Sequence, residues 1–166
     1  MKISKDQLLA HLTTFKVGGK AKYFTKVKNQ KDLISALNFA KEDNLEIFIL
    51  GNGSNVLISD SGFDGLVIKN EIKFLKSKNF KSKVILDIGS GNNWDKIVLL
   101  ACNNNLEGIE CLSGIPGTVG AAPISNIGAY GQELSNVFIK AKVLDLKTYK
   151  IKTFFKKDCD FSYRNS

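Results

Sequence analysis

The most distinctive stretch of the sequence is Ser113-Gly114-Ile115-Pro116-Gly117-Thr118-Val119-Gly120-Ala121-Ala122-Pro123-Ile124-Ser125-Asn126-Ile127-Gly128-Ala129-Tyr130-Gly131-Gln132-Glu133. It is rich in small residues but too apolar for a linker, so we expect a tightly folded loop with short helical turns. Glycine recurs at every third position from Gly114 to Gly120, which would let a flat ligand or a phosphate lie directly on the backbone. A tight loop under a helix explains this composition equally well.

A second glycine loop lies earlier in the chain, Leu50-Gly51-Asn52-Gly53-Ser54-Asn55-Val56, between two expected strands at 47–50 and 56–58. Its glycines, hydroxyl and amides allow backbone N–H groups to converge on an anion such as a pyrophosphate. It lacks both the G-x-G-x-x-G pattern of dinucleotide-binding folds and the Gly-Lys-Ser/Thr of a P-loop. Taken alone, it fits a plain glycine turn better than a binding site.

Periodic apolar residues predict helices and strands around these loops. Helical spacing predicts a helix over 32–41, capped by Asn29. A second helix, capped by Asn92 and ending near Asn104, is expected to pack on a sheet through one face, made of Trp94, Ile97, Val98, Ala101 and Cys102. Further strands are expected at 65–68, 84–88, 143–146 and 150–154. The mixture indicates an α+β fold.

The lysine-rich stretch from Asn70 to Lys83 has weak periodicity. We take it as the boundary between two α+β lobes, 1–72 and 73–166.

The composition narrows the class of partner. A net charge of +8 attracts anions, but the lysines are scattered and Arg164 is the only arginine, so a solvated surface is favoured over a nucleic-acid partner. No apolar run approaches the roughly 20 residues of a membrane span, and the first residues do not resemble a secretory signal. We therefore expect a cytoplasmic protein without a membrane partner.

The metal-binding residue types are too sparse for a metal site. Three cysteines without a close pair argue against a disulfide framework and a zinc ribbon. The single histidine, His11, excludes a multi-histidine site. No metal is expected.

Four motifs occur in a fixed order along the chain, at Thr13–Ala21, Leu50–Asp60, Ser113–Glu133 and Tyr163-Arg164-Asn165-Ser166. Together they resemble the flavin-binding half of the UDP-N-acetylenolpyruvoylglucosamine reductases, also called UDP-N-acetylmuramate dehydrogenases. The resemblance implies a two-lobed FAD-binding domain of the vanillyl-alcohol oxidase / p-cresol methylhydroxylase type.

The same resemblance implies FAD held noncovalently, NADPH as hydride donor, and UDP-N-acetylglucosamine enolpyruvate as the substrate that is reduced. Arg164 matches the cation that stabilises charge developing on the substrate carboxylate, a role that a permanently charged, two-pronged guanidinium suits. Tyr130 matches a position beside the uridine-diphosphate site. The residues expected to hold the cofactor are Gly51, Asn52, Gly53, Ser54, Asn55, Ser113, Gly114, Pro116, Gly117, Gly120 and Ala121.

The resemblance also implies parts that this sequence lacks. The proton-donating serine and the assisting glutamate belong to a carboxy-terminal substrate domain that is expected to be absent here, and neither Ser162 nor Ser166 should inherit the serine's role. We therefore expect a fragment truncated within the flavin domain and inactive alone. Two alternatives stay open: a basic module that binds nucleic acid or acidic partners, and another flavin oxidase of the same fold. The oligomeric state is not predicted.

Overall fold

The computed structural model describes all 166 residues and divides them into two compact units. Unit 1 contains Met1–Leu75 and Asp87–Asn92, and unit 2 contains Lys76–Leu86 and Asn93–Ser166. The chain thus enters unit 2, returns briefly to unit 1, and then completes unit 2. None of the helices is both long enough and apolar enough to cross a bilayer.

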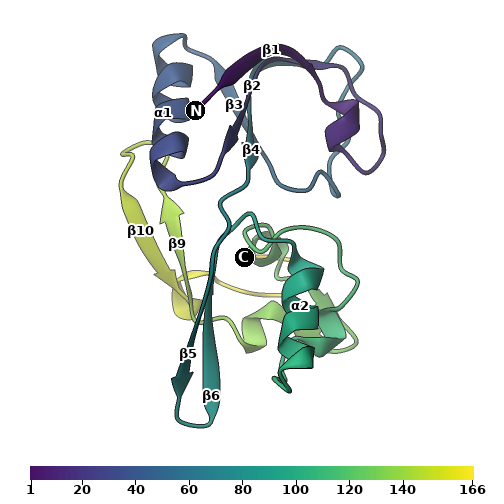
Figure 1. Cartoon of the computed structure of the whole chain (residues 1–166), viewed down its shortest axis with the longest axis vertical. Helices are drawn as coiled ribbons and strands as arrows, with labels where there is room; N and C mark the ends of the chain where they lie inside the picture. The colour runs from purple at the N-terminus through teal and green to yellow at the C-terminus, as the bar shows by residue number, and fades with distance from the viewer. The chain divides into compact units, whose positions relative to one another are not determined.

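Unit 1 is built on a four-stranded sheet (Figure 1). Its strands are β1 (Ile3–Leu8), β2 (Lys20–Val27), β3 (Glu46–Leu50) and β4 (Phe63–Asn70), in the order β1-β2-β4-β3. Strand β1 runs antiparallel to β2, whereas β2 and β3 both run parallel to the central β4. The expected strands at 47–50 and 65–68 are confirmed within β3 and β4.

Helix α1 (Gln30–Glu42) covers one face of this sheet and follows the predicted cap, Asn29, although it begins two residues before the expected range 32–41. The Asn29 side chain accepts a hydrogen bond from the Asp32 N–H at 2.9 Å, which satisfies one of the free donors of the first turn. The helix buries Ala36, Leu37 and Ala40. Tyr23 of β2 meets Phe39 edge to face, with ring centroids 5.2 Å apart.

The second face of the sheet is covered by loops instead of a helix. Its buried cluster consists of Leu9, Ala21, Phe24, Leu50 and Val67. Val56 and Ile58 pack against this cluster, but residues 56–58 form no strand, so the strand expected there is wrong. The apolar side chains of Val56 and Ile58 cover the sheet, but their backbone pairs with no strand.

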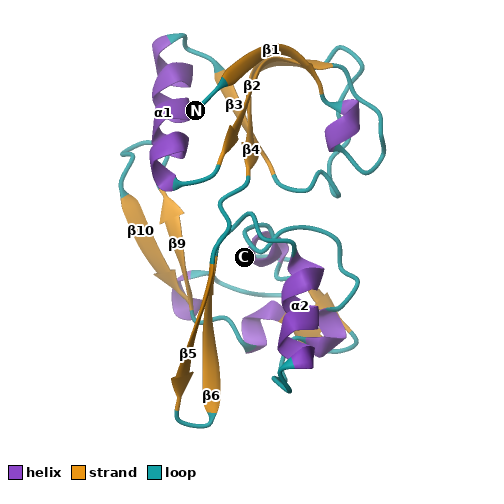
Figure 2. Ribbon diagram, viewed as in Figure 1, coloured by secondary structure: helices purple, strands orange, loops and turns teal.

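Short hairpins and one α-helix make up most of unit 2, and the ends of the first hairpin extend into unit 1 (Figure 2). The hairpins pair β5 (Leu75–Phe80) with β6 (Lys83–Ile88), β7 (Gly128–Ala129) with β8 (Gln132–Glu133), and β9 (Lys140–Leu144) with β10 (Ile151–Phe155). The expected strands at 84–88, 143–146 and 150–154 fall in β6, β9 and β10, each with shifted ends. Single 3-10 turns occupy Ala10–Leu12 in unit 1 and Glu110–Leu112, Ala122–Ser125, Leu134–Asn136 and Lys156–Asp158 in unit 2.

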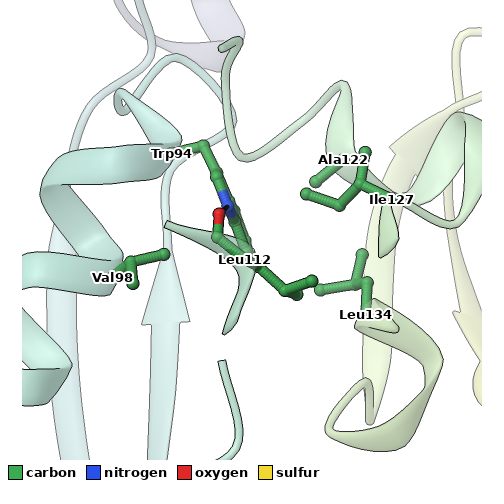
Figure 3. Close-up of a cluster of buried hydrophobic side chains, with 6 residues drawn as sticks. All are labelled: Trp94, Val98, Leu112, Ala122, Ile127 and Leu134. Atoms are coloured by element: carbon green, nitrogen blue, oxygen red, sulfur yellow. Dashed lines mark hydrogen bonds between the residues drawn. The ribbon is translucent and has the colours of Figure 1, made fainter. Parts of the chain in front are cut away.

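Helix α2 (Trp94–Asn103) organises the core of unit 2 (Figure 3). Its buried residues Trp94 and Val98 pack against the small-residue stretch and the turns beside it. The expected packing of the helix on a sheet stays a prediction. The cluster is Trp94, Val98, Leu112, Ala122, Ile127 and Leu134. The Trp94 indole N–H donates to the Leu112 carbonyl at 3.0 Å, which satisfies the one polar atom that this large side chain buries.

Two details of α2 differ from the prediction. The cap is Asn93, whose side chain accepts from the Lys96 N–H, whereas the Asn92 side chain is directed to the carbonyls of Phe74 and Gly89, to which it donates. Cys102 is exposed and does not belong to the buried face.

Candidate functional site

The loop Gly51–Asn55 of unit 1 leaves three successive backbone donors free. The N–H groups of Gly53, Ser54 and Asn55 donate to no group of the chain. The loop follows directly on β3, and Ser54 and Asn55 are partly or fully exposed. Gly53 itself is buried. Unpaired backbone donors bind phosphate oxygens in glycine loops, so this loop, with Ser54 and Asn55 at its exposed side, fits the diphosphate of a dinucleotide.

Gly53 is a glycine for a steric reason. It has a φ of +72°, and a Cβ placed on it would lie 2.1 Å from the Leu12 carbonyl oxygen. Its own carbonyl accepts a hydrogen bond from the Thr14 N–H at 2.9 Å. The loop is therefore pressed against the backbone of residues 12–14, which belong in part to the opening motif of the sequence. This contact joins two motifs that are about 40 residues apart.

Lys69 is a residue of this loop region that the sequence prediction missed. Its Nζ donates to the carbonyl of Gly51 from the end of β4, next to Leu50 of β3. Burial lowers the pKa of the Lys69 ammonium. The sequence contained one indication of this role. Lys69 directly follows the apolar run Leu66-Val67-Ile68, at a position where the strand pattern does not require a side chain that faces solvent.

The second glycine segment, in unit 2, is held by a carboxylate from α2. Asp95 Oδ1 accepts hydrogen bonds from the Gly114 N–H at 2.6 Å and from the Ser113 hydroxyl at 3.0 Å. These two bonds, the backbone one first, hold the pKa of Asp95 below its ordinary value. The donors of Ser113 and Gly114 are therefore occupied, unlike those of the first loop.

The rest of this segment is closed by turns and by the start of α2. The Gly117 carbonyl accepts from the Trp94 N–H at 3.2 Å, and the Ala121 N–H donates to the Thr118 carbonyl at 3.0 Å. Pro116 and Ala121 are exposed, whereas Gly117 and Gly120 are half-buried. The expected tight loop with short helical turns is confirmed.

Tyr130 lies at the tip of the β7–β8 hairpin and is 93% exposed. Tyr130 and Gly131 have φ values of +52° and +79°, as the two central residues of a type I′ turn require. A large aromatic ring held in solvent on a tight turn packs against no core. The ring is therefore available to a ligand.

Arg164 also lies in a tight turn, closed by hydrogen bonds of 3.1 Å in both directions between Ser162 and Asn165. Its φ is +55°, its side chain is exposed, and its guanidinium lies over the Tyr163 ring at 6.0 Å from the centroid. No carboxylate forms an ion pair with it. The guanidinium of the only arginine of the chain thus has no carboxylate partner within the chain.

A family described as an FAD binding domain matches residues 21–152, which is most of the chain. The chain belongs to this family. The FAD-binding match includes both glycine segments and Tyr130, whereas Arg164 lies beyond it. It confirms the flavin-binding class that the four motifs indicate.

Two proteins of the same name are similar to the chain over nearly its whole length. UDP-N-acetylenolpyruvoylglucosamine reductase of Amoebophilus asiaticus is 42% identical over 100% of the chain and 49% of its own length. The crystal structure of the reductase from Thermus caldophilus matches 99% of the chain and 56% of that protein, with a TM-score of 0.79 and 26% identity. The chain spans about half the length of the curated relatives it matches, and corresponds to their amino-terminal portion.

A third similarity concerns the fold alone. A vanillyl-alcohol-oxidase-type flavoprotein from Myceliophthora thermophila is 18% identical and covers 80% of the chain and 26% of its own, with a TM-score of 0.63. The expected α+β fold of the vanillyl-alcohol oxidase type is confirmed.

Proposed function

We propose that this chain binds FAD noncovalently, with its diphosphate on the loop Gly51, Asn52, Gly53, Ser54 and Asn55. The observation that carries the proposal is the run of three free backbone donors at Gly53, Ser54 and Asn55 inside the region matched to FAD-binding domains. A diphosphate offers only acceptor oxygens and negative charge, so it complements these donors. Lys69 fixes the start of the loop through the Gly51 carbonyl and adds positive charge nearby.

The second segment contributes shape in this proposal. Ser113, Gly114, Pro116, Gly117, Gly120 and Ala121 are small or rigid residues at which a flat ring system can approach the backbone closely. Ser113 and Gly114 contribute through their bonds to Asp95 and not as donors to the cofactor, because their donor groups are already bonded to this carboxylate. Asp95 therefore maintains the shape of the segment.

We further propose that the chain is the flavin-binding part of a reductase that converts UDP-N-acetylglucosamine enolpyruvate to UDP-N-acetylmuramate, a step of peptidoglycan precursor synthesis in the cytoplasm. The relatives that match the whole chain have this name. Bound FAD supplies hydride transfer in such enzymes, with NADPH as the donor. Because the chain spans half of these relatives, we do not expect 166 residues alone to complete the reaction.

Two residues of unit 2 are proposed to contact the substrate. Arg164 binds the enolpyruvyl carboxylate with its unpaired guanidinium and stabilises negative charge that develops there during reduction. Tyr130 contacts the nucleoside-diphosphate part through its exposed ring.

The flavin proposal is tested by the visible absorption spectrum of the purified chain after incubation with FAD and desalting. The informative variant is Asn55→Asp, which puts a carboxylate on the exposed edge of the diphosphate loop. Gly53→Asp would be misleading, because any side chain there meets the Leu12 carbonyl and unfolding alone would release flavin. The matched control is Asn105→Asp, the same change at an exposed position of unit 2.

Retained flavin bands in the parent and in Asn105→Asp, with loss in a folded Asn55→Asp, are the expected result. A folded parent that loses all flavin on desalting would contradict the proposal for this chain. Equal retention in both variants would contradict the assignment of the diphosphate to the loop after β3.

A further inference from the structure

One fully hydrogen-bonded side chain of unit 2 is a buried amide with no role in the proposals above. Asn126 is 1% exposed and ends the 3-10 turn Ala122–Ser125 in the left-handed conformation, with a φ of +41°. Asparagine tolerates this conformation better than most residues, but glycine would suffice for the backbone alone. The amide therefore has a purpose beyond the turn.

The two donors of the Asn126 amide bond to two different segments. Nδ2 donates to the Glu133 carboxylate at 2.7 Å and to the Ser162 carbonyl at 3.1 Å. Oδ1 accepts from the Ser135 N–H at 3.0 Å, and the Ser135 hydroxyl also reaches Glu133 at 3.3 Å. Every hydrogen-bonding group of this side chain is satisfied away from solvent, which makes the arrangement costly to break.

The segments that Asn126 joins are those that present Tyr130 and Arg164. Glu133 pairs with Gly128 at the base of the hairpin whose tip is Tyr130. Ser162 begins the turn that holds Arg164, two residues further on. Without this link, the turn is attached through the edge-to-face contact of Phe161 with Phe138 and the exposed bond from the Ser166 hydroxyl to the Ile124 carbonyl.

We propose that Asn126 is a positioning residue, which fixes the Arg164 turn through the Ser162 carbonyl and, through Glu133, sets the Arg164 turn against the Tyr130 hairpin. This inference rests on the proposed function for the purpose of Arg164, but the order of the turn is measurable without flavin or substrate. A colourless chain would therefore leave the positioning role open to test.

The experiment uses the uniqueness of Arg164. In a chain labelled with ¹⁵N-arginine, a single backbone amide resonance reports the order of this turn. The main variant is Asn126→Asp, which keeps the shape, the tolerance of positive φ and an acceptor for Ser135, but has no amide donors. The order parameter of the Arg164 amide is expected to fall from about 0.85 to below about 0.6. The Trp94 indole resonance, also unique, should keep its position because the core is unchanged.

Two controls separate positioning from general loosening. Ser166→Ala removes the exposed tether to Ile124, and should leave the Arg164 order parameter unchanged. The double variant Asn126→Asp with Glu133→Gln restores a donor between positions 126 and 133 but supplies none to Ser162, so Arg164 should stay mobile. Recovery of Arg164 order in the double variant, or an unchanged order parameter in Asn126→Asp, overturns the proposal.

If Asn126→Asp does not fold, hydrogen exchange of the Asn126 side chain in the parent protein tests the proposal instead. Both Nδ2 protons of Asn126 should exchange with water at least about ten-fold more slowly than those of the exposed Asn55 amide, since each has its own acceptor. Fast exchange of either proton overturns the proposal.

Discussion

The two glycine segments resemble each other in composition but differ in how tightly they are packed and in whether their backbone donors are free. In the loop Gly51–Asn55, glycine is required because Gly53 presses on the Leu12 carbonyl, and the following N–H groups are free. In the segment after Ser113, no atom lies within 4 Å of a Cβ placed on Gly114, yet its N–H is bonded to Asp95. The first loop has no room for a side chain at Gly53, but its backbone donors are free to bind an anion. The second segment has room for a side chain at Gly114, but the Asp95 carboxylate already occupies its donors.

Glycine content alone therefore does not identify a phosphate site. The Asp95 carboxylate beside Ser113 and Gly114 would repel a phosphate at those donors, which supports the proposal that the anion binds at the first loop. Substitutions that treat the two glycines alike should therefore give unlike results.

The largest effect is expected for Gly53→Ala. The new methyl group cannot avoid the Leu12 carbonyl, and alanine also resists a φ of +72°. We expect a loss of roughly 2–4 kcal/mol in the free energy of unfolding, the sum of overpacking and backbone strain. Urea unfolding of the variant measures this loss. A midpoint equal to that of the parent would show that the contact with residues 12–14 is not tight.

Gly114→Ala is the matched comparison and should be milder. Open space surrounds the position, so only the φ of +76° opposes a side chain. The expected loss is about 1–2 kcal/mol in the same urea experiment. If Gly114→Ala proved as damaging as Gly53→Ala, the distinction between a packed and an open glycine would fail.

A smaller effect is expected at the cap of α2. Asn93→Ala removes the acceptor for the Lys96 N–H, at a position that also forms a bridge with Thr118 of the second segment. The expected loss is about 1 kcal/mol. Asn29→Ala at the cap of α1 is the counterpart in unit 1, where no such segment is attached. Urea unfolding followed by circular dichroism measures the stability of both variants. An Asn93→Ala protein as stable as the parent would show that the packing of Trp94 alone sets the start of α2.

The helices and strands that short-range sequence patterns determine were predictable. Structure that depends on contacts between distant segments was less so. The cap at Asn29 and the strands at 47–50 and 65–68 follow from short-range patterns, and the structure confirms them. The false strand at 56–58 arose because apolar residues can cover a sheet as well as extend it.

The candidate site follows the same rule. Composition singled out both glycine segments, and the four motifs added Tyr130 and Arg164. The position of Lys69 after an apolar run was visible in the sequence, but its bond to Gly51 was not, because that bond depends on the parallel pairing of β3 with β4. The link from Asn126 to Ser162 spans 36 residues and is visible only in three dimensions.

The smallest and most specific effect concerns the internal anion of the second segment. Because hydrogen bonds from Gly114 and Ser113 favour the charged form, the pKa of Asp95 lies below its ordinary value of 3.8. A depressed pKa in the folded state means that these bonds stabilise the protein above pH 3.8, and that the contribution is lost as the pH falls through the lower, folded value. An NMR pH titration of the Gly114 amide should therefore show a midpoint below 3.8.

Three variants sharpen the measurement. Asp95→Asn should remove the acid transition of the Gly114 amide. Ser113→Ala should move its midpoint only part of the way toward 3.8, because the backbone bond from Gly114 is the larger cause of the shift. Ser166→Ala, which lies on the far tether to Ile124, should leave the midpoint where it is. A parent midpoint at or above 3.8 would mean that Asp95 does not occupy the Gly114 donor, and the second segment would then be as free to bind an external phosphate as the first.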